Sequence, residues 1–212
     1  MLENMSRLLD LDMESIDYIA VTSGPGSFTG LRIGASTAKG LAFGLNKDII
    51  AVSTLEVLAY ELYGANGLIC PLLDARRSQV YTAIFSFSSE NTGDDKRKLT
   101  MIKEPSALSI EETAENINSV LGITAVRMPA VCTPASVFLT GDGTEVYSDR
   151  LKALIKAPVF TAPLNNNRQL ASALCALAEE KARNGEVIRP KALELQYLRV
   201  SQAERMKSGK AD

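Results

Sequence analysis

The sequence contains no histidine. Because imidazole serves as the base in Ser-His-Asp and Cys-His pairs and as a common metal ligand, its absence excludes these nucleophilic sites and any His-ligated zinc or iron. The cysteines Cys70, Cys132 and Cys175 lie too far apart for a Cys-x-x-Cys pair or a disulfide framework, and we predict that each is a small buried apolar residue. No pattern indicates a cofactor, and a metal site made of carboxylates alone has no support.

The sequence also lacks an excess of charge of either sign and any long apolar run. It has 23 Lys and Arg against 25 Asp and Glu, a formal charge of -2. Proteins that coat nucleic acid need clustered Lys and Arg, so an RNA contact would have to be local or shared with a partner. No run approaches the about 18 apolar residues of a membrane span, and residues 1–17 are acidic where a signal peptide is basic and then apolar. We expect a cytoplasmic protein with no membrane segment.

The first part of the chain alternates strand-like and helix-like stretches. We predict strands at 18–22 and 49–52 and helices at 28–45 and 53–63. The first strand runs into the tight turn Gly24-Pro25-Gly26, and Ser53 and Glu56 have the spacing of a capping box. This order predicts parallel strands joined by crossover helices.

The rest of the chain first changes pattern and then repeats the opening. We predict strands at 67–73, 80–87 and 99–103 in an antiparallel meander, a helix at 110–120, strands at 136–140 and 157–160, and helices after Gly143 and at 168–183. The second half of this order matches the first 64 residues. We therefore predict two related α/β lobes that face each other, residues 1–64 and 65–212, with a mobile tail from about residue 200.

Two glycine turns follow corresponding strands and have two possible roles. Gly24 and Gly26 in the first lobe correspond to Gly141 and Gly143 in the second. Backbone N–H groups at such strand-to-helix turns can hold an anion, although the spacing fits neither phosphate-binding glycine motif. The alternative is that these glycines only allow the chain to turn sharply. The carboxylates of Asp74 and Asp142 each follow a predicted strand, but they form no compelling acid–base pair.

Small residues recur along the helix predicted at 28–45. Gly30, Gly34, Ala38 and Ala42 are spaced four residues apart, and we predict that they share one face. Glycine costs a helix interior about 1 kcal/mol relative to alanine, so a close approach of another backbone is expected there. The face either packs on the chain's own sheet or forms a seam with a second chain.

Several stretches together resemble the bacterial TsaB (YeaZ) family, in order and over nearly the whole chain. They are Ser23-Gly24-Pro25-Gly26-Ser27-Phe28-Thr29-Gly30-Leu31-Arg32-Ile33-Gly34, Ala38-Lys39-Gly40-Leu41-Ala42, Val52-Ser53-Thr54-Leu55-Glu56, Asp74-Ala75-Arg76-Arg77, Thr140-Gly141-Asp142-Gly143 and Tyr197-Leu198-Arg199. The first stretch is the most specific. The resemblance implies an α/β, two-lobed fold of the acetate kinase, hexokinase and actin type, which is ribonuclease H-like.

The resemblance also implies a function. TsaB-like proteins form a heterodimer with the transferase TsaD, are joined by the ATPase TsaE, and support threonylcarbamoyl transfer to adenosine 37 of tRNA. A chain without histidine cannot reproduce the histidine pair that binds metal in TsaD-type proteins. The implied interface uses first-lobe helices, which here gives Thr29, Gly30, Leu31, Gly34, Ala38, Leu41 and Ala42.

One departure from the family concerns the front of the chain. Family members usually begin with roughly forty further residues that include a strand with an Asp-Thr-Ser-like motif, so we expect the first lobe to be truncated at its N-terminus.

The sequence leaves two functions to consider. The first is a non-catalytic scaffold that binds a TsaD-like subunit, can form a homodimer, and meets tRNA only within the complex. The alternative is a phosphotransferase or ATPase that binds nucleotide between the glycine turns and uses Asp74 or Asp142.

Overall fold

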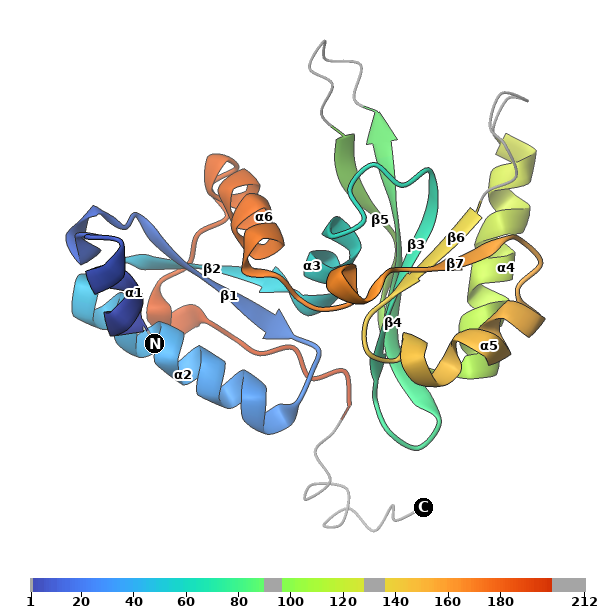
Figure 1. The fold of residues 1–212 in the computed structure, drawn as a ribbon, viewed down its shortest axis with the longest axis horizontal. Helices are drawn as coiled ribbons and strands as arrows, with labels where there is room; N and C mark the ends of the chain where they lie inside the picture. Colours follow the sequence, from blue (N-terminus) through green and yellow to red (C-terminus); the bar gives the residue numbers. More distant parts are fainter. Residues whose placement is uncertain (1, 90–96, 128–135, 200–212) are drawn as a thin grey trace.

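A computed structural model describes residues 2–89, 97–127 and 136–199. Two sheets stand apart, each with helices packed on it (Figure 1). The first sheet is the parallel pair β1 (Tyr18–Gly24) and β2 (Asp48–Ser53), preceded by α1 (Leu2–Leu8) and the short 3-10 helix η1 (Met13–Ser15). The parallel pairing of the first two predicted strands is confirmed.

The helices of the first lobe begin where their capping residues lie. α2 (Phe28–Leu45) has Ser27 as N-cap, whose side chain accepts a hydrogen bond from Gly30 N, and ends at Asn46 in the left-handed conformation. α3 (Thr54–Tyr60) starts with the predicted capping box, in which Ser53 N donates to the Glu56 carboxylate at 3.2 Å. Local sequence signals therefore decide both starts.

The second sheet has the order β5-β4-β3-β6-β7. Its strands are β3 (Gly67–Asp74), β4 (Gln79–Ser89), β5 (Arg97–Ser109), β6 (Ser136–Thr140) and β7 (Val159–Thr161). β3, β4 and β5 form the predicted antiparallel meander, and β6 and β7 add parallel strands. β5 is longer than the predicted 99–103, because it continues past an irregularity in register opposite Ile84.

One face of the second sheet is covered by α4 (Ile110–Arg127) and α5 (Thr144–Leu154). Their apolar side chains enclose the largest core, which includes the fully buried Cys70, Ile110 and Leu151. Burial of Cys70 confirms the prediction for that cysteine and raises the pKa of its thiol. The prediction for Cys175 is wrong, because this residue lies on the exposed side of its helix, and Cys132 lies outside the described residues.

The helices α3 and α6 (Ala171–Arg183) lie between the sheets. α3 packs Leu55 and Leu58 on the second sheet and Val57 on the first. α6, which follows β7 and the short helix η2 (Leu164–Asn166), packs Ala173 and Leu177 on the first sheet. The two helices also contact each other between the sheets. They therefore connect the two cores.

The chain after α6 stays with the first lobe. Ile188 forms an antiparallel bridge with Ile49 of β2, and η3 (Pro190–Ala192) and Leu193 then pack under α2. By contact, residues 171–199 belong to the first lobe although they follow the second in sequence. None of the helices in the described ranges is long and apolar enough to cross a membrane. The predicted mobile tail from about residue 200 lies outside the described residues.

Candidate functional site

The two glycine turns lie at the carboxyl ends of β1 and β6, which both point toward the region between the lobes (Figure 1). Gly24 has φ +117°, and a Cβ on it would lie 2.6 Å from the carbonyl oxygen of Gln196. Gly141 has φ +96°, and a Cβ on it would meet the carbonyl oxygen of Leu72. Both positions therefore need glycine for conformation and for close packing.

The second glycine of each turn, Gly26 or Gly143, is less constrained. A Cβ on Gly143 would come 3.1 Å from Leu72, whose carbonyl oxygen accepts a hydrogen bond from Gly143 N at 3.0 Å. A Cβ on Gly26 would meet only the Leu31 side chain, at 3.9 Å. The second turn is thus fastened to the backbone of β3 at two points.

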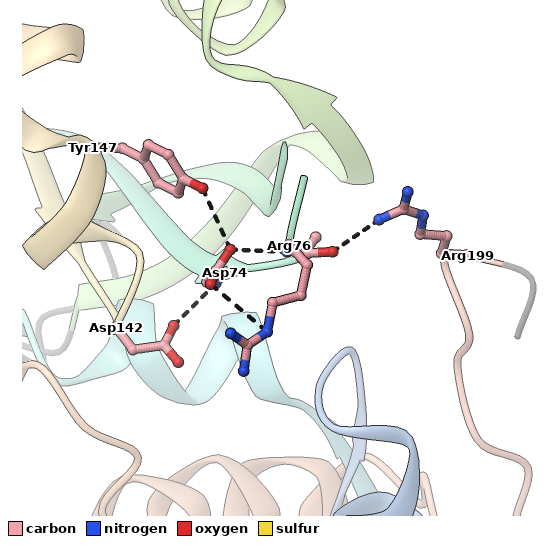
Figure 2. Close-up of polar contacts among 6 residues, drawn as sticks. Asp74, Arg76, Asp142, Tyr147 and Arg199 are labelled. Atoms are coloured by element: carbon pink, nitrogen blue, oxygen red, sulfur yellow. Dashed lines mark hydrogen bonds and ion pairs between the residues drawn. The ribbon is translucent and has the colours of Figure 1, made fainter. Parts of the chain in front are cut away.

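The structure brings Asp74 and Asp142 together at one edge of the second sheet. β3 and β6 are parallel neighbours, and their carboxyl ends carry the two carboxylates. Asp142 Oδ1 accepts a hydrogen bond from Asp74 N at 3.1 Å (Figure 2). Asp74 Oδ1 accepts from Arg76 N at 2.8 Å and from the Tyr147 hydroxyl at 3.5 Å. Both carboxylates are engaged within the chain.

The electrostatics of this edge follow from the same contacts. Arg76 Nε lies 4.0 Å from Asp74 Oδ2 and partly balances its charge. Desolvation and the charge of Asp74 raise the pKa of Tyr147, so the phenol stays protonated and donates. Among the described residues no group of three or more Cys, Asp and Glu side chains could hold a metal ion.

The turn between β3 and β4 has an unusual backbone. Arg76, Arg77 and Ser78 have φ values of 65°, 56° and 56°, a left-handed region that non-glycine residues rarely occupy. The turn is closed by a hydrogen bond from Ala75 N to Gln79 O at 3.0 Å. Arg199 Nη1 donates to Ala75 O at 2.8 Å, which ties the end of the described chain to this turn (Figure 2).

Residues 193–199 run from the first lobe to that turn. Gln196 N donates to Ser23 O at 2.8 Å, and the Tyr197 ring packs on Phe28 with a centroid distance of 5.0 Å. Arg32 lies 3.9 Å above the Phe28 ring and donates from Nε to the Tyr197 hydroxyl at 3.3 Å. Sequence reasoning missed these contacts, since no local pattern pairs residues 165 positions apart.

This segment lines a large cavity, and another lies in the second lobe. The first, of about 670 Å³, lies between residues 192–198, the end of the first sheet and β5, and its polar lining includes Glu56, Glu104 and Lys181. The second, of about 730 Å³, lies beside Asp142 and is lined by Glu145, Arg168 and the buried Asn167, which donates to Thr144 Oγ1 at 2.8 Å. Both contain charges of both signs.

The small residues of α2 do not share one face. Ala38 and Ala42 are buried against the chain's own first sheet together with Leu31, whereas Gly30 is exposed and Gly34 half-buried. The reason is geometric, because four residues advance about 40° beyond one helical turn and the series drifts from the surface into the core. Of the predicted interface residues, Leu31, Ala38 and Ala42 thus face inward, Thr29 and Gly30 are exposed, and Gly34 and Leu41 are half-buried.

The side of α2 that faces away from the sheet carries other small residues. We call it the outward face, and it consists of Thr29, Ile33, Ser36, Thr37, Gly40 and Gly44. Nothing lies within 4 Å of a Cβ placed on Gly40 or Gly44, and the Ile33 side chain is 63% exposed. Phe43 beside this face, and Leu8 and Leu9 at the end of α1, are also exposed. The first lobe therefore presents apolar surface that needs an explanation.

Comparisons with known proteins agree with this fold. A family model described as "TsaD: tRNA N6-adenosine threonylcarbamoyltransferase" matches residues 1–206. The chain is 48% identical over 86 residues to the "tRNA threonylcarbamoyladenosine biosynthesis protein TsaB" of Bacillus subtilis, a match covering 40% of this chain and 38% of that protein. It is 42% identical over 73 residues to the Escherichia coli protein of the same name, a match covering 34% of this chain and 32% of that protein.

A solved structure extends the likeness to nearly the whole chain. The structure described as "YeaZ from Pseudomonas aeruginosa" superimposes with a TM-score of 0.68 and 25% identity, covering 93% of this chain and 81% of that one. The predicted two-lobed α/β fold and the resemblance to TsaB (YeaZ) proteins are confirmed. The chain's matched segments span only about a third of the curated relatives' own length.

Proposed function

Since the chain belongs to the family of tRNA N6-adenosine threonylcarbamoyltransferases, we propose that it takes part in forming threonylcarbamoyladenosine in tRNA as a non-catalytic subunit. It would act in the cytoplasm as a scaffold for a TsaD-like catalytic subunit, joined by a TsaE-like ATPase. In the absence of that subunit it would form a homodimer, and it would meet tRNA only within the complex. No membrane takes part.

The observation that carries this proposal is the outward face of α2. Gly40 and Gly44 have no side chain to cover the helix backbone, which lets a second helix approach closely. Ile33, which is 63% exposed, supplies an apolar side chain for such a contact. Thr29, Gly30, Gly34 and Leu41 lie on or beside this face. Leu31, Ala38 and Ala42 would act only indirectly, because they are buried on the inner side of the helix.

The scaffold role also agrees with the available chemistry. The sequence has no histidine to serve as a general base. Asp142 accepts a hydrogen bond from Asp74 N at the end of β3, and Asp74 accepts from Arg76 N and from the Tyr147 hydroxyl. Carboxylates used in this way favour a structural role at the sheet edge.

Replacing Gly40 by leucine tests the docking face. We expect Gly40→Leu to fold, because its Cβ enters open space and leucine is a better helix former, but to lose co-purification with the TsaD-like subunit. The matched control is Gly122→Leu, which makes the same change at a position of α4 that also has nothing within 4 Å. Circular dichroism would verify both folds. Undiminished co-purification of Gly40→Leu would refute docking on this face.

One observation favours the alternative, a nucleotide-binding phosphotransferase or ATPase. The fold brings Asp74 and Asp142 to adjacent strand ends beside the 730 Å³ cavity. Calorimetry of the isolated chain with Mg-ATP separates the two functions. Micromolar binding with turnover would establish the alternative, and we expect neither.

A further inference from the structure

Four arginines and two aromatic rings lie along a path from the start of α2 to the β3–β4 turn. They are Phe28 and Arg32 of α2, Arg76 and Arg77 of the β3–β4 turn, and Tyr197 and Arg199 of the segment that joins them. We call this set the arginine–aromatic surface. Contacts link its members. Arg32 contacts Phe28 and Tyr197, and Arg199 donates a hydrogen bond to the carbonyl oxygen of Ala75, next to Arg76.

The charges of this surface are concentrated although the whole chain carries only -2. The Arg76 side chain is 88% exposed, and its ion pair with Asp74 is long, at 4.0 Å. Arg32 contacts the Phe28 ring and the Tyr197 hydroxyl, which are both uncharged and do not neutralise its positive charge. The nearby carboxylates are Asp74 and Asp142, which accept hydrogen bonds beside Arg76, and Glu104 and Glu194, which line the cavity next to Tyr197. Such a local arginine cluster favours a polyanion.

The rings add a second kind of recognition. Phe28 and Tyr197 are 38% and 42% exposed although both are large and apolar. Their planes are tilted by 40°, with Arg32 stacked over the Phe28 ring. Unpaired RNA bases stack on aromatic rings and on guanidinium planes, while phosphates pair with neighbouring arginines. A membrane surface would use the charges but not this geometry.

The surface is held in shape before anything binds. Arg76 and Arg77 lie in a turn with a left-handed backbone, and the hydrogen bond from Arg199 to Ala75 O fastens residues 193–199 to that turn. A prearranged site loses less conformational entropy on binding.

We propose that the arginine–aromatic surface contacts the phosphate backbone and an unpaired base of the tRNA substrate. This inference rests on the proposed function, since it assumes that the chain works on tRNA inside the complex. It adds a location for RNA contact, which extends from the start of α2 in the first lobe to the β3–β4 turn of the second.

The test uses the complex of the full chain with the TsaD-like subunit and a fluorescein-labelled, unmodified tRNA transcript. We expect Arg76→Gln/Arg77→Gln to weaken tRNA affinity about tenfold near physiological salt and to reduce the slope of log K against log salt by about 1.5. The matched control, Lys152→Gln/Lys156→Gln, removes the same charge from an exposed part of the second lobe and should change affinity less than about twofold.

Arg32→Gln is a second variant that leaves the strained turn untouched, and we expect a loss of about threefold to fivefold. If both arginine variants form the complex and bind tRNA with unchanged affinity, this inference is overturned, whereas the proposed function still stands. Failure of the wild-type chain to bind the TsaD-like subunit would instead refute the proposed function. Loss of subunit binding with unaltered tRNA affinity would make the surface a protein interface and would also overturn the inference.

Discussion

The turns that begin at Gly24 and Gly141 look alike in the sequence but are held by different parts of the molecule. Both follow a parallel strand, both start with a glycine at positive φ, and both precede a helix. Gly141 lies against Leu72 in the central strand of the second sheet. Gly24 lies against Gln196, in an extended segment near the end of the described chain. The same local pattern therefore sits in a rigid environment in one lobe and against a single segment in the other.

The largest effect is expected at the second turn. Gly141→Ala would place a methyl group into the carbonyl of Leu72 while holding a left-handed backbone, and we expect a loss of about 3 kcal/mol or more in the free energy of unfolding. Urea denaturation measures it. Gly143→Ala is the control, with a milder 3.1 Å contact and no positive φ, and should cost about 1 kcal/mol. Equal losses in the two variants would contradict the role given to Gly141.

A smaller effect is expected at the first turn. Gly24→Ala should cost about 2 kcal/mol, because part of the clash with Gln196 O is relieved when residues 193–199 move away. Faster proteolysis near Tyr197 would report that movement. Gly64→Ala isolates the backbone strain, since Gly64 also has positive φ but nothing within 4 Å, and should cost about 1 kcal/mol. If Gly24→Ala lowers the free energy of unfolding as much as Gly141→Ala does, the two turns do not differ in how firmly their surroundings hold them.

The smallest effect concerns pH at the second turn. The pKa of Tyr147 is raised by desolvation and by Asp74, so the folded state holds this proton more tightly than the unfolded chain does. Its contribution to stability is complete below the unfolded pKa of about 10 and is lost as pH rises through the folded value. Tyr147→Phe should leave stability at pH 7 nearly unchanged and flatten its decline above about pH 10. A decline of the same steepness in Tyr147→Phe would rule out this linkage.

Much of the fold could be predicted because its signals are local. The capping box of Ser53 and Glu56, the glycines after β1 and β6, and the alternation in β4 each specify structure within a few residues. The places of α3 and α6 could not be predicted. α3 contacts both sheets and α6 packs on the first, and only the three-dimensional arrangement decides this.

The candidate site divides in the same way. The stretch around Gly30 and Gly34 indicated the family, but a four-residue spacing drifts by about 40° at each step, and Ala38 and Ala42 turn out to face inward. Asp74 and Asp142 were candidates because each follows a strand, and their contact required the parallel pairing of β3 with β6.

By itself the sequence determined the order of helices and strands, the family and the absence of histidine chemistry, because these depend on residue types and short spacings. The tertiary structure alone decided which face of α2 is free, which sheets α3 and α6 contact, and how Arg199 reaches the turn at Ala75. These features depend on contacts between residues far apart in the chain. Their energies come from packing and hydrogen bonds that exist only once both lobes have formed.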